Sequence, residues 1–143
     1  MGNMIKVGMA DLKICKAPDA LTTLGLGSCI GACLYDPVVK IAGMVHYMLP
    51  DSTKIKSNQN IAKFGDTGIR ELIRLMEEAG ARKSRIVAKI AGGARMFAVS
   101  ASVNLPGLNV GENNIEAARL NLSENGIAII AEDVGLNYGR TIE

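Results

Sequence analysis

One group of residues in this chain could support covalent catalysis. Cys29 follows the uncharged, glycine-rich stretch Thr23-Leu24-Gly25-Leu26-Gly27-Ser28, and His46 is the only histidine among 143 residues. The ordinary pKa of imidazole lies close to neutral pH, so His46 is the side chain best suited to take the proton of a thiol. An imidazolium beside a cysteine lowers the thiol pKa and raises the population of the reactive thiolate. These residues predict a cysteine nucleophile with a histidine base.

The glycines before Cys29 indicate how an intermediate could be stabilised. Gly25 and Gly27 allow the chain to bend and bring backbone N–H groups close to the sulfur. We therefore expect the N–H groups of Ser28 and Cys29 to hold the oxyanion of a tetrahedral intermediate. One such donor is worth about 3 kcal/mol in a transition state.

A third group should fix the tautomer of the imidazole. No acidic residue lies close to His46 in the sequence, so a hydroxyl from Thr22, Thr23 or Ser28 could take this role. The spacing alone leaves a second interpretation open, in which His46 is a core or surface histidine without a catalytic role.

The other cysteines and glycines favour simpler interpretations. Most cysteines pack as small apolar residues, and we expect this of Cys15 and Cys33. Cys29, Cys33 and His46 could supply three metal ligands, but a structural zinc site needs four, so we predict no metal. Gly92-Gly93 could cradle an anion, yet no phosphate-binding signature accompanies the pair. No cofactor is predicted.

Composition and charge exclude several classes of protein. The hydrophobic fraction of 48% and charged fraction of 21% are typical of a globular domain, and the length fits a single domain over residues 1–143. A net charge of +2 with only 3% aromatic residues argues against nucleic acid as a partner. We find neither a signal-peptide core nor the ~20 apolar residues that a membrane span needs. The odd number of cysteines, 3, fits a reducing compartment, so we predict a cytoplasmic protein without membrane insertion.

Hydrophobic periodicity predicts an α+β domain, in which strands outnumber helices about six to two. Extended segments are expected over residues 4–16, 41–49, 85–90, 127–131 and 138–142. A further one begins at about Leu21, is broken by Gly25 and Gly27, and resumes over residues 30–35. The apolar alternation in the first segment changes phase near Asp11, which we interpret as a bulge or an edge position. The polar residues 51–60 are expected to form a loop that could gate the site.

Two amphipathic helices are expected over residues 66–79 and 114–125. Asp66 would cap the first and Gly80 would end it. Asn113 and Glu116 would form a capping box for the second. The predicted architecture has a mixed sheet in the middle, with the helices covering its outer faces.

Five sequence blocks resemble the CheD family of bacterial chemotaxis proteins, in order and in spacing. They are Thr23-Leu24-Gly25-Leu26-Gly27-Ser28-Cys29, Met44-Val45-His46-Tyr47-Met48-Leu49-Pro50-Asp51, Ala88-Lys89-Ile90-Ala91-Gly92-Gly93-Ala94, Asn113-Asn114-Ile115-Glu116-Ala117, and Ala131-Glu132-Asp133 with Gly139-Arg140-Thr141 following. The resemblance extends from about Ile5 to the C-terminus.

The resemblance implies a chemoreceptor glutamine deamidase that needs no cofactor. It implies Cys29 as the nucleophile, His46 as the base and Thr23 as the residue that orients the imidazole. It also implies a fold of stacked mixed β-sheets with flanking helices, related to the cytotoxic necrotizing factor deamidases. Chemoreceptors are the implied substrates, and some relatives bind the phosphatase CheC. A binding module that docks CheC or chemoreceptors is the alternative function.

Overall fold

The computed structural model describes residues 2–96 and 109–143. The strands in these ranges are β1 (Met4–Lys6), β2 (Asp11–Lys16), β3 (Ala20–Leu26), β4 (Ile30–Asp36), β5 (Ile41–Tyr47), β6 (Val87–Gly92), β7 (Ala128–Val134) and β8 (Arg140–Ile142). The helices are α1 (Gly65–Glu78) and α2 (Val110–Glu124). No helix in the described part of the chain is both long and apolar enough to cross a membrane.

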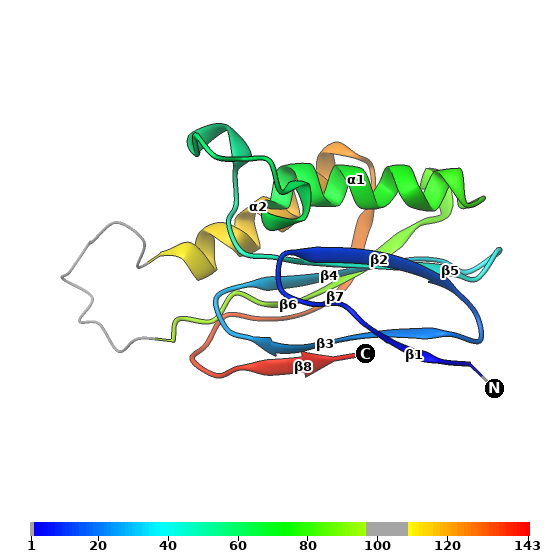
Figure 1. Ribbon diagram of the computed structural model, residues 1–143, viewed down its shortest axis with the longest axis horizontal. Helices are drawn as coiled ribbons and strands as arrows, with labels where there is room; N and C mark the ends of the chain where they lie inside the picture. The colour runs from blue at the N-terminus through cyan, green and yellow to red at the C-terminus, as the bar shows by residue number, and fades with distance from the viewer. Residues whose placement is uncertain (1, 97–108) are drawn as a thin grey trace.

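The strands form two mixed sheets that stack on one another (Figure 1). The larger sheet has five strands in the order β2-β5-β4-β6-β7, with β6 and β7 parallel and the other neighbours antiparallel. The smaller sheet has the order β1-β3-β8, with β1 parallel and β8 antiparallel to β3. The predicted α+β class with stacked mixed sheets and two helices is confirmed.

Both helices lie on the same face of the five-stranded sheet, and the smaller sheet covers the other face (Figure 1). The buried face of α1 carries Ile69, Leu72 and Met76, which belong to one apolar cluster with Val45 and Tyr47 of β5. Burying side chains of this size stabilises the fold by about 1.5–3 kcal/mol each. The expected placement of the helices on two outer faces is therefore wrong, because a second sheet occupies one of those faces.

The segment over residues 4–16 forms two strands in different sheets. β1 pairs with β3, whereas β2 pairs with β5. Between them Val7 is buried and Ala10 has a φ of 55°. The change of phase near Asp11 is therefore a crossing between sheets and not a bulge in one strand. The alternative of an edge position is confirmed, because β1 and β2 are both edge strands.

The helix ends differ from the prediction in two places. Asp66 does not cap α1; its carboxylate accepts hydrogen bonds from the N–H and the hydroxyl of Ser52. α2 begins at Val110, so Asn113 lies inside the helix and donates its N–H to the carbonyl of Asn109. The predicted end of α1 is confirmed, because Gly80 has a φ of +117°.

Candidate active site

A hydrogen bond between Thr23 and His46 joins the two sheets. Thr23 lies on β3 and His46 on β5, and both side chains are buried in the space between the sheets. The hydroxyl oxygen of Thr23 is 2.8 Å from Nδ1 of His46 and 2.6 Å from the carbonyl oxygen of Val7. The neighbouring Thr22 instead donates its hydroxyl to the carbonyl of Ile142, at 2.9 Å. The sequence offered the hydroxyls of Thr22, Thr23 and Ser28 as partners for His46, and Thr23 is the one that contacts the imidazole.

This pair of contacts determines the tautomer of neutral His46. A carbonyl oxygen can only accept, so the single hydroxyl proton of Thr23 goes to Val7. Thr23 must then accept a proton from Nδ1 of His46. The lone pair of the neutral ring is therefore on Nε2, which is buried and has no hydrogen-bond partner among the described residues. The neutral ring is thereby held in one tautomer, and its unprotonated nitrogen has no partner among the described residues.

Cys29 lies just before β4, at the end of the space that contains His46. In the sheet, Gly31 of β4 is directly opposite His46. A Cβ on Gly31 would lie 2.7 Å from the side chain of Ile142 and 3.1 Å from that of Leu26, so the smaller sheet packs closely over this position. Cys29 belongs to the same apolar cluster as Leu26. The thiol and the imidazole lie between the same two sheets, and no hydrogen bond joins them in this structure.

The loop before β4 is held by its carbonyl groups. The carbonyl oxygen of Gly27 accepts from the N–H of Ala94 at 2.9 Å, and that of Cys29 accepts from the N–H of Gly93 at 2.8 Å. The carbonyl of Ser28 accepts from the side-chain amide of Asn114 at 2.8 Å. Three consecutive carbonyls are thus fixed by residues far away in the sequence.

These anchors also set the direction of the N–H groups. The C=O and N–H of a trans peptide unit point in opposite directions, so a fixed carbonyl fixes the N–H of the next residue. Within residues 2–96 and 109–143, the N–H groups of Ser28 and Cys29 have no backbone acceptor. The predicted oxyanion donors are therefore oriented and unoccupied by backbone acceptors.

The glycine pair after β6 lies against Cys29. Gly92 has a φ of +109°, and a Cβ at this position would lie 2.1 Å from the carbonyl oxygen of Cys29. Gly93 has a φ of +67° and donates its N–H to the same oxygen. Gly92 and Gly93 therefore pack around the backbone carbonyl of Cys29, the residue that carries the thiol.

Burial opposes charge on both reactive side chains. It raises the pKa of the Cys29 thiol and lowers the pKa of His46, although the N–H of Cys29 partly offsets the effect on the thiol. Both directions favour a neutral thiol and a neutral imidazole. The sequence predicted a thiolate–imidazolium pair, and burial disfavours both charges of that pair.

A pocket of about 380 Å³ gives access to Cys29 from outside. Met9, Met48 and Met96 contribute apolar side chains to its wall, and Arg95 contributes a charged one. His46 is 1% exposed and does not line this pocket. An uncharged carboxamide suits a wall that is mostly apolar.

Comparison with known proteins identifies the family. The family model described as CheD chemotactic sensory transduction matches residues 48–143. A protein of Lachnoclostridium phytofermentans named "Probable chemoreceptor glutamine deamidase CheD" is 63% identical over 143 residues, which cover 100% of this chain and 88% of the relative. The chain belongs to the CheD family. The "Chemoreceptor glutamine deamidase CheD" of Halalkalibacterium halodurans is 46% identical over 144 residues, again covering 100% and 88% of the two chains.

A solved structure supports the fold of this CheD family member. A Neisseria meningitidis protein of the DUF152 family has a TM-score of 0.53 and 9% sequence identity, with 93% of this chain and 64% of that chain covered. This likeness concerns the fold alone. The related fold of the cytotoxic necrotizing factor deamidases stays a prediction.

The other two cysteines have packing contacts. Cys15 lies 3.5 Å from the carbonyl oxygen of Asp19, and both Cys15 and Cys33 pack around Met44 between the sheets. Burial raises the pKa of Cys33 to about 11. Among the described residues, no three His, Cys, Asp or Glu side chains gather in a way that could hold a metal ion.

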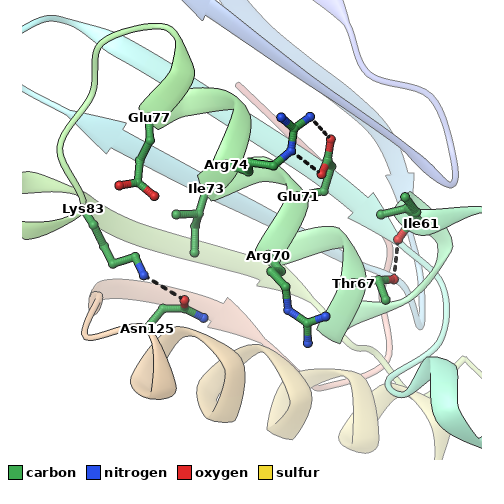
Figure 2. Close-up of a pocket in the computed structure, with 9 residues that line it drawn as sticks. All are labelled: Ile61, Thr67, Arg70, Glu71, Ile73, Arg74, Glu77, Lys83 and Asn125. Carbon is green, nitrogen blue, oxygen red and sulfur yellow. Dashed lines mark hydrogen bonds and ion pairs between the residues drawn. The ribbon is translucent and has the colours of Figure 1, made fainter.

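A second hollow lies on the helix side of this CheD family member (Figure 2). Its wall includes Ile61 and Ile73, with Arg74 paired to Glu71 at 2.6 Å and Lys83 bonded to Asn125 at 3.3 Å. No thiol or imidazole lines it. It has the character of a solvated protein surface, and the chemistry is better placed beside Cys29.

Asn114 is a site residue that the sequence reasoning missed. We interpreted Asn113 and Asn114 as the start of a helix, but Asn114 lies within α2 and is fully buried against the Cys29 loop. A signal was present, because Asn114 precedes Ala118 by four positions and so shares the apolar face of the helix. A polar residue on that face indicates a buried partner.

Proposed function

We propose that this chain is a chemoreceptor glutamine deamidase in which Cys29 is the nucleophile, His46 the base and Thr23 the residue that orients His46. The observation that carries the proposal is the Thr23–His46 hydrogen bond, which leaves the lone pair of the buried ring on Nε2. The names of its close relatives within the CheD family support the choice of substrate. The mostly apolar pocket beside Cys29 supports an uncharged side chain as the group that enters.

In the first half of the reaction, Nε2 of His46 takes the thiol proton as the sulfur of Cys29 attacks the side-chain carboxamide carbon. The electron pair of the C=O bond moves to the oxygen, where the N–H groups of Ser28 and Cys29 donate hydrogen bonds. The imidazolium then protonates the nitrogen, the C–N bond breaks, and ammonia leaves. A thioester between the substrate and Cys29 remains.

In the second half, water replaces ammonia. Nε2 of His46 takes a proton from the water as its oxygen attacks the thioester carbon, and the N–H groups of Ser28 and Cys29 again hold the oxyanion. The C–S bond breaks, the sulfur recovers its proton from the imidazolium, and a glutamate side chain is released. The receptor gains one negative charge, which changes the repulsion between packed helices.

Deamidation of a purified chemoreceptor cytoplasmic fragment tests this function. The chain should convert specific glutamines to glutamates, seen by peptide mass spectrometry as replacement of NH2 by OH, with one ammonia released for each conversion. Reaction in ¹⁸O-labelled water should place the label in the new carboxylate. A fragment that remains unchanged in the presence of folded protein would refute the proposal.

The alternative is a binding module that docks CheC or chemoreceptors in the cytoplasm. The hollow in Figure 2 supports it, because an apolar wall with charged side chains suits a protein surface. The two functions differ in a deletion strain, where a docking module would restore chemotaxis with Cys29→Ala and a deamidase would not. The stronger support lies with the deamidase, since the Thr23–His46 arrangement has no use in docking.

A further inference from the structure

Asn114 connects the loop that carries Cys29 to the end of the strand that carries His46. Its side-chain amide nitrogen donates to the carbonyl oxygen of Ser28 at 2.8 Å and to that of Met48 at 2.9 Å. Ser28 immediately precedes Cys29, and Met48 follows His46 by two positions. Both protons of the buried Asn114 amide are therefore bonded to backbone carbonyls, one next to Cys29 and one close in sequence to His46.

A third bond fixes Asn114 itself. The hydroxyl of Tyr47 donates to the backbone carbonyl of Asn114, at 2.5 Å, and Tyr47 is the residue after His46. The first turn of α2 also approaches the glycine pair, since a Cβ on Gly111 would lie 2.7 Å from the carbonyl oxygen of Gly93. The helix α2, which carries Asn114, therefore contacts both the Cys29 loop and the glycine pair that holds it.

The arrangement has a cost in stability. The oxygen Oδ1 of Asn114 is buried without a hydrogen-bond partner among the described residues. Rotating the amide would not relieve this, because the oxygen would then face the carbonyls of Ser28 and Met48. A buried acceptor left without a partner is rare in folded proteins and calls for an explanation other than stability.

We infer that Asn114 is a positioning residue that aims the N–H of Cys29 at the oxyanion. The carbonyl that Asn114 holds and the N–H of Cys29 belong to the same planar peptide unit. Fixing the carbonyl toward α2 fixes this N–H toward the opposite side of the peptide unit. The inference rests on the proposed deamidase function.

Asn114→Asp tests the inference, because the carboxylate has the same shape but cannot donate to the two carbonyls. Removing an oxyanion donor lowers kcat by about 10²-fold or more, so we expect a fall of about 10²-fold with little change in KM. The ¹⁵N–¹H resonance of Cys29 should shift as well. This second measurement needs no substrate, so it separates a failure of the inference from a failure of the deamidase assignment.

Two controls lie on the same helix. Asn121→Asp makes the same chemical change at a side chain whose one hydrogen bond, among the described residues, goes to the carbonyl of Ala117 in α2. Leu122→Ala removes a fully buried side chain from the core. Both should keep the wild-type kcat per folded molecule. If Leu122→Ala, compared at equal distance from its melting temperature, loses as much activity as Asn114→Asp, the role of Asn114 is merely structural and the inference is wrong.

Tyr47→Phe keeps the inference testable if Asn114→Asp fails to fold. This variant removes the hydroxyl that holds the backbone of Asn114 and leaves both side-chain bonds in place. We expect a several-fold fall in kcat and a smaller shift of the Cys29 N–H resonance. Wild-type values of both would overturn the inference.

Discussion

The hydroxyl group of Thr23 contacts both the backbone carbonyl of Val7 and the imidazole of His46. Its oxygen lies 2.6 Å from the first and 2.8 Å from Nδ1 of the second. Val7 belongs to the segment that crosses between the two sheets, so the geometry of that crossing determines the protonation pattern of the ring. The structure therefore links the stacking of the sheets to the availability of a base.

Replacing the Thr23 hydroxyl should disable His46 as a base without creating a cavity in the core. Thr23→Val keeps the shape of the side chain but leaves the Val7 carbonyl and the Nδ1 proton of His46 without partners. We expect unfolding to be easier by about 1–3 kcal/mol and kcat to fall by about 10²-fold, since general-base catalysis contributes on this scale. Thermal unfolding and ammonia release measure the two effects.

Thr23→Ser is the matched control because it retains the hydroxyl. It should keep most of the activity, and its ¹⁵N spectrum should show the proton on Nδ1. His46 is the only histidine, so the spectrum contains a single imidazole. A wild-type spectrum with the proton on Nε2 at neutral pH would contradict the assigned tautomer.

The pH dependence of kcat/KM should report the buried ring. In the proposed mechanism neutral imidazole is the active form. Burial lowers the pKa of His46, so activity should persist below the ordinary histidine pKa of about 6.5. Loss of half the activity at or above that pH would show that the ring is not held neutral.

Alkylation offers a parallel measurement on the sulfurs. Cys29 should react with iodoacetamide faster than Cys33 near neutral pH, because burial raises the pKa of Cys33 to about 11. The rate at Cys29 should still rise with pH above neutrality, since its own pKa is raised. A rate that is flat from pH 6 upward would instead indicate a preformed ion pair.

Gly92→Ala should displace the loop that carries the thiol. The added Cβ would lie 2.1 Å from the carbonyl oxygen of Cys29, at a φ of +109° that an alanine rarely adopts. We expect a loss of about 2–4 kcal/mol in stability together with most of the activity. Urea unfolding and ammonia release measure both.

Gly126→Ala separates the effect of backbone strain from that of steric overlap between the added Cβ and its neighbours. Gly126 has a φ of +71°, but no atom lies within 4 Å of an added Cβ. Its stability should fall by about 1–2 kcal/mol with no loss of activity per folded molecule. Equal effects of the two substitutions would show that the contact with Cys29 has no special importance.

Local sequence signals predicted the parts of the fold that depend on neighbouring residues. The apolar spacing of Ile69, Leu72 and Met76 predicts α1, and Gly80 predicts its end, because both follow from helix geometry. The assignment of residues 4–16 to one strand was wrong because pairing between sheets is not encoded in the alternation of a single segment. The same applies to the helices, whose apolar faces do not reveal which side of a sheet they cover.

Part of the candidate site could also be predicted from the sequence. Cys29 and His46 were selected from residue type and scarcity, and Thr23 from the CheD resemblance. An anion cradle at Gly92-Gly93 was considered and found poorly supported, but the sequence does not show that the neighbour of Gly92 in space is the carbonyl of Cys29. Asn114 was missed for a related reason, since its partners lie far away along the chain.

Ammonia release by Cys29→Ala is the most direct test of the account, with a purified chemoreceptor fragment as substrate and Cys33→Ala as the control. Cys33 lies on β4, packs around Met44 and does not line the pocket at Cys29. We predict no detectable ammonia from folded Cys29→Ala and nearly wild-type release from Cys33→Ala. Wild-type release by Cys29→Ala would contradict the assignment of the nucleophile.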